Sequence, residues 1–229
     1  MIRAYHFLSD DMRCDEDIIA GRDEPWHLGE LRTFAPMRLD AGDGGFISLS
    51  GYHSSPSLWD AMLQADGPIA CAVEISDPIS TDGDLQQGFF QISSLRKLTA
   101  AVDVSAELRL YACACAERVL SIFESRYSRD DRPRRAINTA FDYAHRRATA
   151  QDLEAALILA RDAANTAAGL ARIAALSAFG TAILESQDAA VTAMRNATWA
   201  VDGRGVTTGT ERMWQGEYFD RKFALIFEI

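Results

Sequence analysis

The sequence predicts an α+β fold, with a small N-terminal α/β unit over residues 1–98 and an all-α bundle with a long alanine-rich helix over residues 99–229. Two observations predict this division. All six prolines lie at or before Pro133, and proline is excluded from helix interiors. The later part of the chain instead carries apolar residues at helical spacing, followed by a segment made mainly of alanine.

Short apolar or alternating runs in the N-terminal unit predict strands at residues 2–8, 45–50 and 69–75. A short helix is expected over residues 56–65. Ser55 directly before a proline is typical of a helix cap followed by the first helical turn. The first unit therefore combines strands with at least one helix.

The helical part opens with residues 105–127, which place apolar side chains on one face at steps of three and four residues. Asp131 is a plausible cap close to Pro133, so a second helix is expected over residues 134–148.

Residues 202–210 contain glycines and predict a loop after the alanine-rich segment. The remaining chain is expected to be helical, although its last residues, 221–229, could instead pair as a strand.

An eleven-residue phrase occurs twice in the alanine-rich segment, at residues 159–169 and 170–180. This period matches about 3.67 residues per turn, so the small residues would form a nearly straight stripe along one helix. Gly169 and Gly180 then mark either points of close approach or a bend, and Gly180 could divide the helix. The stripe consists of Ala156, Ala160, Ala164, Ala168, Ala171, Ala175, Ala178 and Ala182.

A stripe of alanines allows a neighbouring helix to approach closely. The favoured interpretation is packing inside the chain's own bundle, and the alternative is a homodimer or partner seam. The residues singled out for such an interface are Ala164, Ala168, Ala171 and Ala175.

The net charge of −10 argues against nucleic acid and anionic membranes as partners, since both require a basic surface. No signal-peptide pattern opens the sequence, and a cytoplasmic location is expected. No cofactor or metal site is expected. In particular, Cys113 and Cys115 would point about 200° apart on a helix.

Arginines form one basic island in this acidic chain. They either pair with nearby carboxylates, including Asp130, Asp131 and the acidic residues 15–17, or form a patch for phosphate or an acidic partner. The island consists of Arg126, Arg129, Arg132, Arg134 and Arg135.

Residues 44–62 are the most site-like stretch. Their glycines allow close backbone approach, and the polar residues that follow precede a helix N-terminus, where N–H groups can meet an anion. The candidate ligand-binding residues are Tyr52, His53 and Ser55.

Four phrases together resemble an uncharacterised family of bacteriophage and prophage proteins: "AYHFLSDDM", "GYHSSPSLWDAM", "ACACAERVLSIFESRYSRDDRPRRAI" and "ERMWQ". The helical "CAERVL" to "DDRPRRAI" portion also resembles a family of immunity proteins. These resemblances imply the architecture and a phage origin. Together with the acidic composition and the absence of a convincing active-site motif, they favour a non-enzymatic phage accessory protein that binds a host protein in the host cytoplasm and inhibits an antiviral defence system.

The N-terminal unit is also similar to the ADP-ribosyltransferase fold, in the order "YHF", "GGFISLSGYHSS", "DAM" and "ACAVEI". This second resemblance implies an NAD-dependent enzyme as the alternative function, and a self-assembling structural protein is a third. The matching catalytic positions would be His6, Glu74 and one serine among Ser48, Ser50, Ser54 and Ser55, with Ser54 the candidate carried forward.

Overall fold

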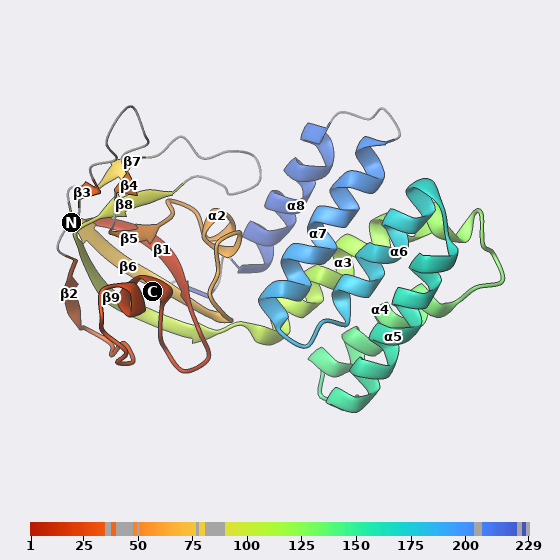
Figure 1. Cartoon of the computed structure of the whole chain (residues 1–229), viewed down its shortest axis with the longest axis horizontal. Helices are drawn as coiled ribbons and strands as arrows, with labels where there is room; N and C mark the ends of the chain where they lie inside the picture. Colours follow the sequence, from red (N-terminus) through yellow and green to blue (C-terminus); the bar gives the residue numbers. More distant parts are fainter. Residues whose placement is uncertain are drawn as a thin grey trace. The chain divides into compact units, whose positions relative to one another are not determined.

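The computed structural model of the chain describes residues 1–34, 38–39, 48–49, 51–76, 78–80, 90–203, 208–223 and 226–227 (Figure 1). The chain forms two compact units, Met1–Asp103 with Leu225–Ile229, and Val104–Ala224. Described strands occur in the first unit, and the second is helical. The α+β fold class is therefore confirmed. The strand at Leu95–Asp103 runs through the expected boundary at residue 98, so the helical unit begins after it.

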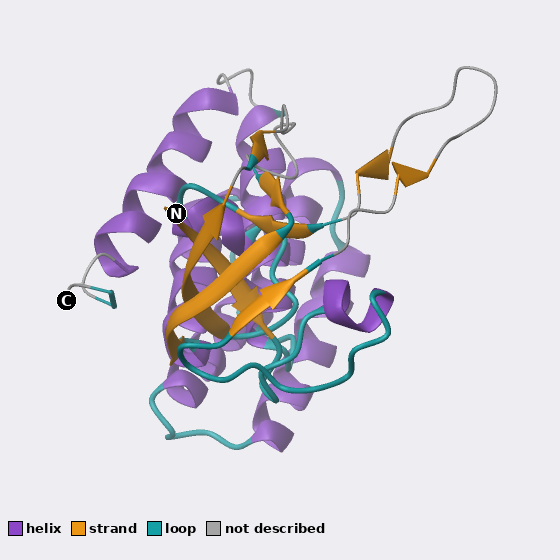
Figure 2. Cartoon of the chain, turned by 90° about the vertical axis from the view of Figure 1, so that its left-hand side faces the viewer, coloured by secondary structure: helices purple, strands orange, loops and turns teal. Residues whose placement is uncertain are grey.

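The N-terminal unit is built on a four-stranded antiparallel sheet in the order β1-β6-β9-β2 (Figure 2). Its strands are β1 (Ile2–Leu8), β6 (Ile69–Ser76), β9 (Leu95–Asp103) and β2 (Leu31–Thr33). A three-stranded sheet contains β5 (Tyr52–Ser54), β8 (Gln91–Ser93) and β7 (Ile79–Ser80). The unit also contains β3 (Arg38–Leu39), β4 (Ser48–Leu49), α1 (Asp15–Ile19) and α2 (Leu58–Met62).

The expected strands at residues 2–8 and 69–75 are confirmed as β1 and β6. Of the expected strand at residues 45–50, the structure describes only β4, and the other residues lie outside the described chain. The expected helix begins later than predicted. Ser57, rather than Ser55, caps α2, because its hydroxyl accepts a hydrogen bond from the Asp60 backbone N–H at 3.1 Å.

Alternation along β1 places His6 on the core face of the sheet. Ala4 and Leu8 share a buried cluster with Cys71 and Val73 of β6, and His6 lies opposite Cys71 in the strand register. Successive side chains of a strand point to opposite faces. His6 therefore points into the unit, on the same side as its apolar core.

β1 also joins the two sheets. Tyr5 and Ser55 exchange two backbone hydrogen bonds, each 2.8 Å long, which hold β5 beside β1. Tyr52 of β5 then contacts the rings of Trp26 and Phe34 edge-on, with 5.6 Å between ring centroids in both cases. The segment after β5 is thus fixed next to His6.

The helical unit contains six described helices (Figure 1). They are α3 (Ser105–Glu124), α4 (Arg132–Ala144), α5 (Ala150–Thr166), α6 (Gly169–Thr181), α7 (Ser186–Asp202) and α8 (Thr208–Phe223). α3 packs against α4, α6, α7 and α8, so it has neighbours on several sides. The predicted apolar face of α3 is buried, and Cys113, on the opposite side from Cys115, is buried as well.

The alanine-rich segment is three helices and not the single long helix that was expected. Ala167 and Ala168 have extended backbones, so α5 ends at Thr166. Gly169 then begins α6 with φ +58°, in the left-handed region that only glycine adopts at little cost. The two copies of the eleven-residue phrase consequently lie mostly on different helices. The stripe folds back on itself and cannot be straight.

Gly180 marks a close approach, and the helix also ends beside it, because α6 stops at Thr181 and α7 begins at Ser186. A Cβ atom at this position would lie 2.7 Å from the backbone nitrogen of Ala193 on α7. The small residues therefore serve the packing of α6 against α7 within one chain.

Arg109 of α3 is buried at the end of α6. Its Nη1 donates to the carbonyl oxygens of Thr181 and Ile183 at 2.7 Å each, and its Nη2 donates to that of Leu184 at 2.6 Å. Its guanidinium also lies 5.1 Å from the ring centroid of Tyr143. The last carbonyls of a helix lack partners inside the helix and carry partial negative charge. Arg109 satisfies them and fixes the α6–α7 turn to α3.

The C-terminal part of the unit is held by a second arginine. Arg118 of α3 pairs with buried Glu211 of α8 at 2.9 Å, and its guanidinium lies 4.0 Å from the ring centroid of Trp214. α8 begins at Thr208, so the expected loop at residues 202–210 is shorter than predicted, with residues 204–207 outside the described chain. Residues 221–223 belong to α8, so this part of the expected helix or strand is helical. Of the remaining residues, the structure describes only 226–227, which form a turn.

Replacing Arg109 by Met should lower the free energy of unfolding by about 3 kcal/mol, because three carbonyls would lose a charged donor. Urea unfolding followed by circular dichroism measures this change. Arg221→Met, an exposed position on α8, is the control and should stay within about 0.5 kcal/mol of the wild type. A loss below about 1 kcal/mol in the Arg109 variant would show that the contacts do not hold the turn.

Candidate functional site

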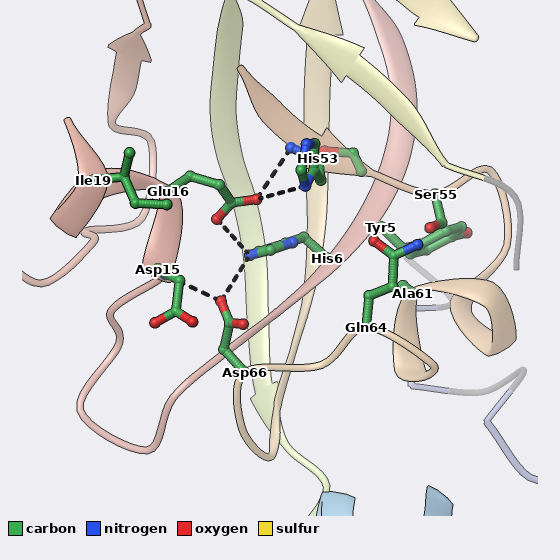
Figure 3. Close-up of a pocket in the computed structure, with 11 residues that line it drawn as sticks. Tyr5, His6, Asp15, Glu16, Ile19, His53, Ser55, Ala61, Gln64 and Asp66 are labelled. Atoms are coloured by element: carbon green, nitrogen blue, oxygen red, sulfur yellow. Dashed lines mark hydrogen bonds and ion pairs between the residues drawn. The ribbon is translucent and has the colours of Figure 1, made fainter. Parts of the chain in front are cut away.

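A pocket of about 260 Å³ lies in the N-terminal unit (Figure 3). It is assembled from β1, α1, β5, α2 and the turn after α2, which are far apart in the sequence. Its lining residues are Tyr5, His6, Asp15, Glu16, Ile19, His53, Ser54, Ser55, Ala61, Gln64 and Asp66. Polar and ionisable side chains are unusually frequent here for a partly enclosed space.

His6 occupies the centre of this pocket, between two carboxylates (Figure 3). Its Nε2 lies 3.9 Å from Glu16 Oε2 and 3.9 Å from Asp66 Oδ2. Both distances exceed a hydrogen bond, and His6 Nε2 and Glu16 Oε2 are buried without a hydrogen-bond partner. Two buried acceptor atoms therefore face each other with no donor between them.

Glu16 reaches the pocket from the first turn of α1. Its Oε1 accepts a hydrogen bond from the His53 backbone N–H at 3.1 Å and lies 3.4 Å from Arg96 Nη2. One oxygen of Glu16 is thus occupied by protein donors, and the other is turned toward His6.

Arg96 of β9 is the buried cation beneath the pocket, with only 1% of its surface exposed. It donates to the His53 carbonyl oxygen and to Glu16, and its guanidinium lies 4.6 Å from the ring centroid of Tyr52. A buried charge is tolerated only when it is paired and hydrogen-bonded. Arg96 therefore requires Glu16 in its observed place.

A second buried network of hydrogen bonds, centred on Asp17, holds α1 in place. Asp17 accepts hydrogen bonds from Arg32 at 2.9 Å and from the Tyr52 hydroxyl at 2.7 Å. Arg32 lies over the Trp26 ring, 4.4 Å from its centroid. This network fixes the short helix that carries Glu16.

The environment separates the protonation states of the pocket groups. Burial, followed by the charge of Arg96, lowers the pKa of His6 to about 3, so His6 is neutral at neutral pH. Burial alone would raise the pKa of Glu16, but Arg96 and the two histidines outweigh it and lower this pKa to about 2. Burial and the charge of Glu16 raise the pKa of Asp66 to about 7.

The structure brings most of the predicted N-terminal site residues to this pocket. His6, His53, Ser54 and Ser55 line it. Tyr52 does not line it, because its side chain points into the core and its hydroxyl binds Asp17. The side chain of Ser48 and the whole of Ser50 lie outside the described chain, so neither serine can be assigned to the pocket.

Glu74 lies away from the pocket. It faces Arg3 in the register of β1 and β6, on the side of the sheet opposite to His6. Its carboxylate pairs with Lys97 at 3.7 Å, and both side chains are about 40% exposed. His6 and Glu74 therefore do not share a site in this structure.

Sequence analysis did not identify Glu16, Asp66 and Arg96 as pocket residues. A signal was present for Asp66, because it precedes Gly67 in a turn. A Cβ atom at Gly67 would lie 2.8 Å from the backbone oxygen of Leu8, so this turn must approach β1 closely. No comparable signal marks Arg96, whose position is set by the pairing of β9 with β6.

The predicted arginine island lies at one end of the helical unit. Arg132 pairs with Asp130 at 2.6 Å and Arg134 pairs with Glu124 at 2.6 Å. Arg126, Arg129 and Arg135 are exposed, and none of them forms an ion pair within the described chain. The pairing interpretation therefore holds for Arg132 and Arg134, and the patch for phosphate or an acidic partner stays a prediction for the other three arginines.

The predicted interface alanines are mostly covered by the chain itself. Ala164, Ala171 and Ala175 are buried, and Ala168 is exposed at the turn between α5 and α6.

Among the described helices, none has the length and hydropathy that crossing a membrane requires.

Comparison with known proteins identifies a family for the helical unit. A family model described as "Imm-5 like putative immunity protein" matches residues 100–219, which is just over half of the chain and nearly all of the helical unit. No curated protein and no solved structure matches the chain. The pocket residues lie outside the matched range.

Replacing Asp66 by Asn should stabilise the protein at pH 8 by about 1–2 kcal/mol and change it little at pH 4. The pKa of Asp66 is raised from 3.8 to about 7, so between these values the folded state holds a proton that the unfolded state has lost. Stability that depends on this proton is lost as the pH rises toward 7. Besides burial, the groups that set the pKa of Asp66 are Glu16, Asp15 and Arg96.

Urea unfolding in chelator-treated buffer at both pH values measures the effect. Asp11→Asn, an exposed substitution in the same unit, is the matched control. Equal effects of the two substitutions at pH 8 would contradict the prediction.

Proposed function

Because the chain belongs to the Imm-5 like putative immunity protein family, we propose that it acts by binding another protein rather than by catalysis. The proposed setting is a bacteriophage or prophage protein that binds a host protein in the host cytoplasm and blocks an antiviral defence system. The observation that carries this proposal is the family match, which falls almost wholly on the helical unit. The partner-binding surface is accordingly sought on that unit.

The surface that best fits such a partner is the arginine end, defined here as Arg126, Arg129, Arg135 and the turn between α5 and α6. Arg126 Nη1 lies 3.8 Å from the place where a Gly169 Cβ atom would be, which brings the arginines next to this turn. Arg132 reaches the same turn and donates to Thr166 Oγ1 at 3.2 Å.

Arg126, Arg129 and Arg135 are exposed and form no ion pair with the described residues, so their charges are available to a partner in a chain of net charge −10. Arginine suits interfaces because its planar guanidinium forms bidentate bonds with carboxylates. The arginine end therefore fits a partner protein that presents an acidic surface.

The tagged chain, expressed in a host bacterium, should retrieve one host protein in a stoichiometric complex. The double variant Arg126→Glu with Arg129→Glu should bind this protein at least about tenfold more weakly, because like charges would then face each other. The matched control Arg221→Glu with Lys222→Glu makes the same charge change on α8 and should bind normally. Phage carrying the wild-type gene should plate better on defended hosts than phage carrying the arginine variant.

This proposal fails if the tagged chain retrieves nothing above background and phage with and without the gene plate equally. If the two double variants bind the host protein equally well, the complex exists but the arginine end is not the surface that forms it.

A second function, NAD-dependent chemistry in the N-terminal unit, is favoured by the pocket itself. His6, Ser54 and Ser55 line it, and the similarity to the ADP-ribosyltransferase fold implies a histidine and a serine at the site; His53 lies beside them. The glutamate in the pocket is Glu16 and not Glu74, so the substitutions Glu16→Gln and Glu74→Gln form a matched pair. Labelled NAD should be consumed by the wild type and by Glu74→Gln, and not by Glu16→Gln. No turnover, no transfer and no rise in melting temperature with NAD would exclude this second function.

A further inference from the structure

We propose that His6, Cys14, Glu16 and Asp66 form a binding site for a Zn²⁺ ion at the base of the N-terminal pocket. One ligand atom each from His6, Cys14 and Glu16 lies within 4.8 Å of the other two, and all three residues are buried. Asp66 Oδ2 approaches the same histidine nitrogen from the pocket side, at 3.9 Å. A nitrogen, a thiol sulfur and two carboxylate oxygens are a ligand set that suits zinc.

His6 is oriented as a metal ligand. Its Nε2 is buried without a hydrogen-bond partner and lies 3.9 Å from Glu16 Oε2 and from Asp66 Oδ2. A neutral imidazole nitrogen in such a position is a common metal ligand.

The buried acceptor atoms lack any donor from the protein. Glu16 Oε2 has no hydrogen-bond partner, and it faces a histidine nitrogen that also has none. Leaving buried polar atoms without partners is costly, and a cation at their meeting point satisfies both at once.

The spacing fits a tetrahedral zinc ion. Zinc bonds of about 2.0–2.3 Å place ligand atoms about 3.3–3.8 Å apart. The observed 3.9 Å from His6 Nε2 to Glu16 Oε2 and to Asp66 Oδ2 is close to this edge length. The ligand atoms of His6, Cys14 and Glu16 already lie within 4.8 Å of one another, whereas Asp66 lies outside that group and its side chain must move to complete the coordination.

The neighbouring charge of Arg96 is compatible with the ion. Arg96 lies 3.4 Å from Glu16 Oε1, the oxygen turned away from His6, and 3.9 Å from Cys14 Sγ. On binding, the Cys14 thiol and the protonated fraction of the Asp66 carboxyl group release their protons to solvent, which leaves a thiolate and two carboxylates. The thiolate, the two carboxylates and the guanidinium together then carry two negative charges, which Zn²⁺ neutralises.

Four protein ligands close the coordination sphere, so the ion would be structural. It would join β1, the start of α1 and the turn after α2, three elements that otherwise meet around buried groups without partners. Binding to the folded state alone stabilises that state.

The full chain, stripped with a chelator, should bind one equivalent of Zn²⁺ in isothermal titration calorimetry, and its melting temperature should rise. Titration with Co²⁺ should produce visible bands together with a thiolate-to-cobalt charge-transfer band in the near ultraviolet. The variant Cys14→Ser should lose the thiolate charge-transfer band, and the variant His6→Ala should lose metal binding. Asp66→Asn, at the partly exposed edge of the pocket, should weaken Zn²⁺ binding at least about tenfold and should fold normally.

Two controls replace residues of the same types outside the site, Cys71→Ala and His27→Ala, and both should bind Zn²⁺ as the wild type does. The proposal is overturned if the wild type shows no saturable binding, if Co²⁺ binds without the thiolate band, or if Asp66→Asn binds Zn²⁺ as tightly as the wild type. It is also overturned if the His27 control loses binding together with the site variants.

Discussion

Each unit of this protein is organised around an arginine that is almost wholly buried, Arg96 in the N-terminal unit and Arg109 in the helical unit. A buried guanidinium needs hydrogen-bond acceptors or an opposite charge close to it, because its desolvation is otherwise too costly. Each arginine therefore dictates where its partners lie. Arg109 requires the end of α6 and the following turn, and Arg96 requires Glu16 and the backbone of β5.

The helical unit combines this constraint with very small contact residues. Alanine buries little apolar area per residue, so close backbone approach must supply many weak contacts. Gly180 shows how close the approach is, because no side chain fits between α6 and α7 at that point. Arg109 holds the turn between the same two helices, so the polar contact and the close packing support each other.

The two units suggest separate roles. The family match falls on the helical unit, whereas the buried ionisable groups gather in the N-terminal unit. In the pocket, a neutral histidine, an ionised glutamate and an aspartate with a raised pKa lie within a few ångströms of one another, and the cause is burial together with the charge of Arg96. Such groups hold a ligand, transfer a proton or bind a cation more readily than exposed ones do. The protein-binding proposal and the metal-site proposal therefore concern different parts of the chain and are tested independently.

The sequence by itself determined the division into a strand-containing part and a helical part, the strands β1 and β6, and the burial of one face of α3. These features follow from alternation, from helical periodicity and from proline placement, all of which act over a few residues. Only the tertiary structure decided that the alanine-rich segment turns at Gly169, because its small residues pack equally well along one helix or between several. Likewise, Glu16, Asp66 and Arg96 meet at His6 through strand pairing and a close turn between elements distant in the chain. Their proximity depends on contacts between segments far apart in the sequence, and local sequence patterns do not predict such contacts.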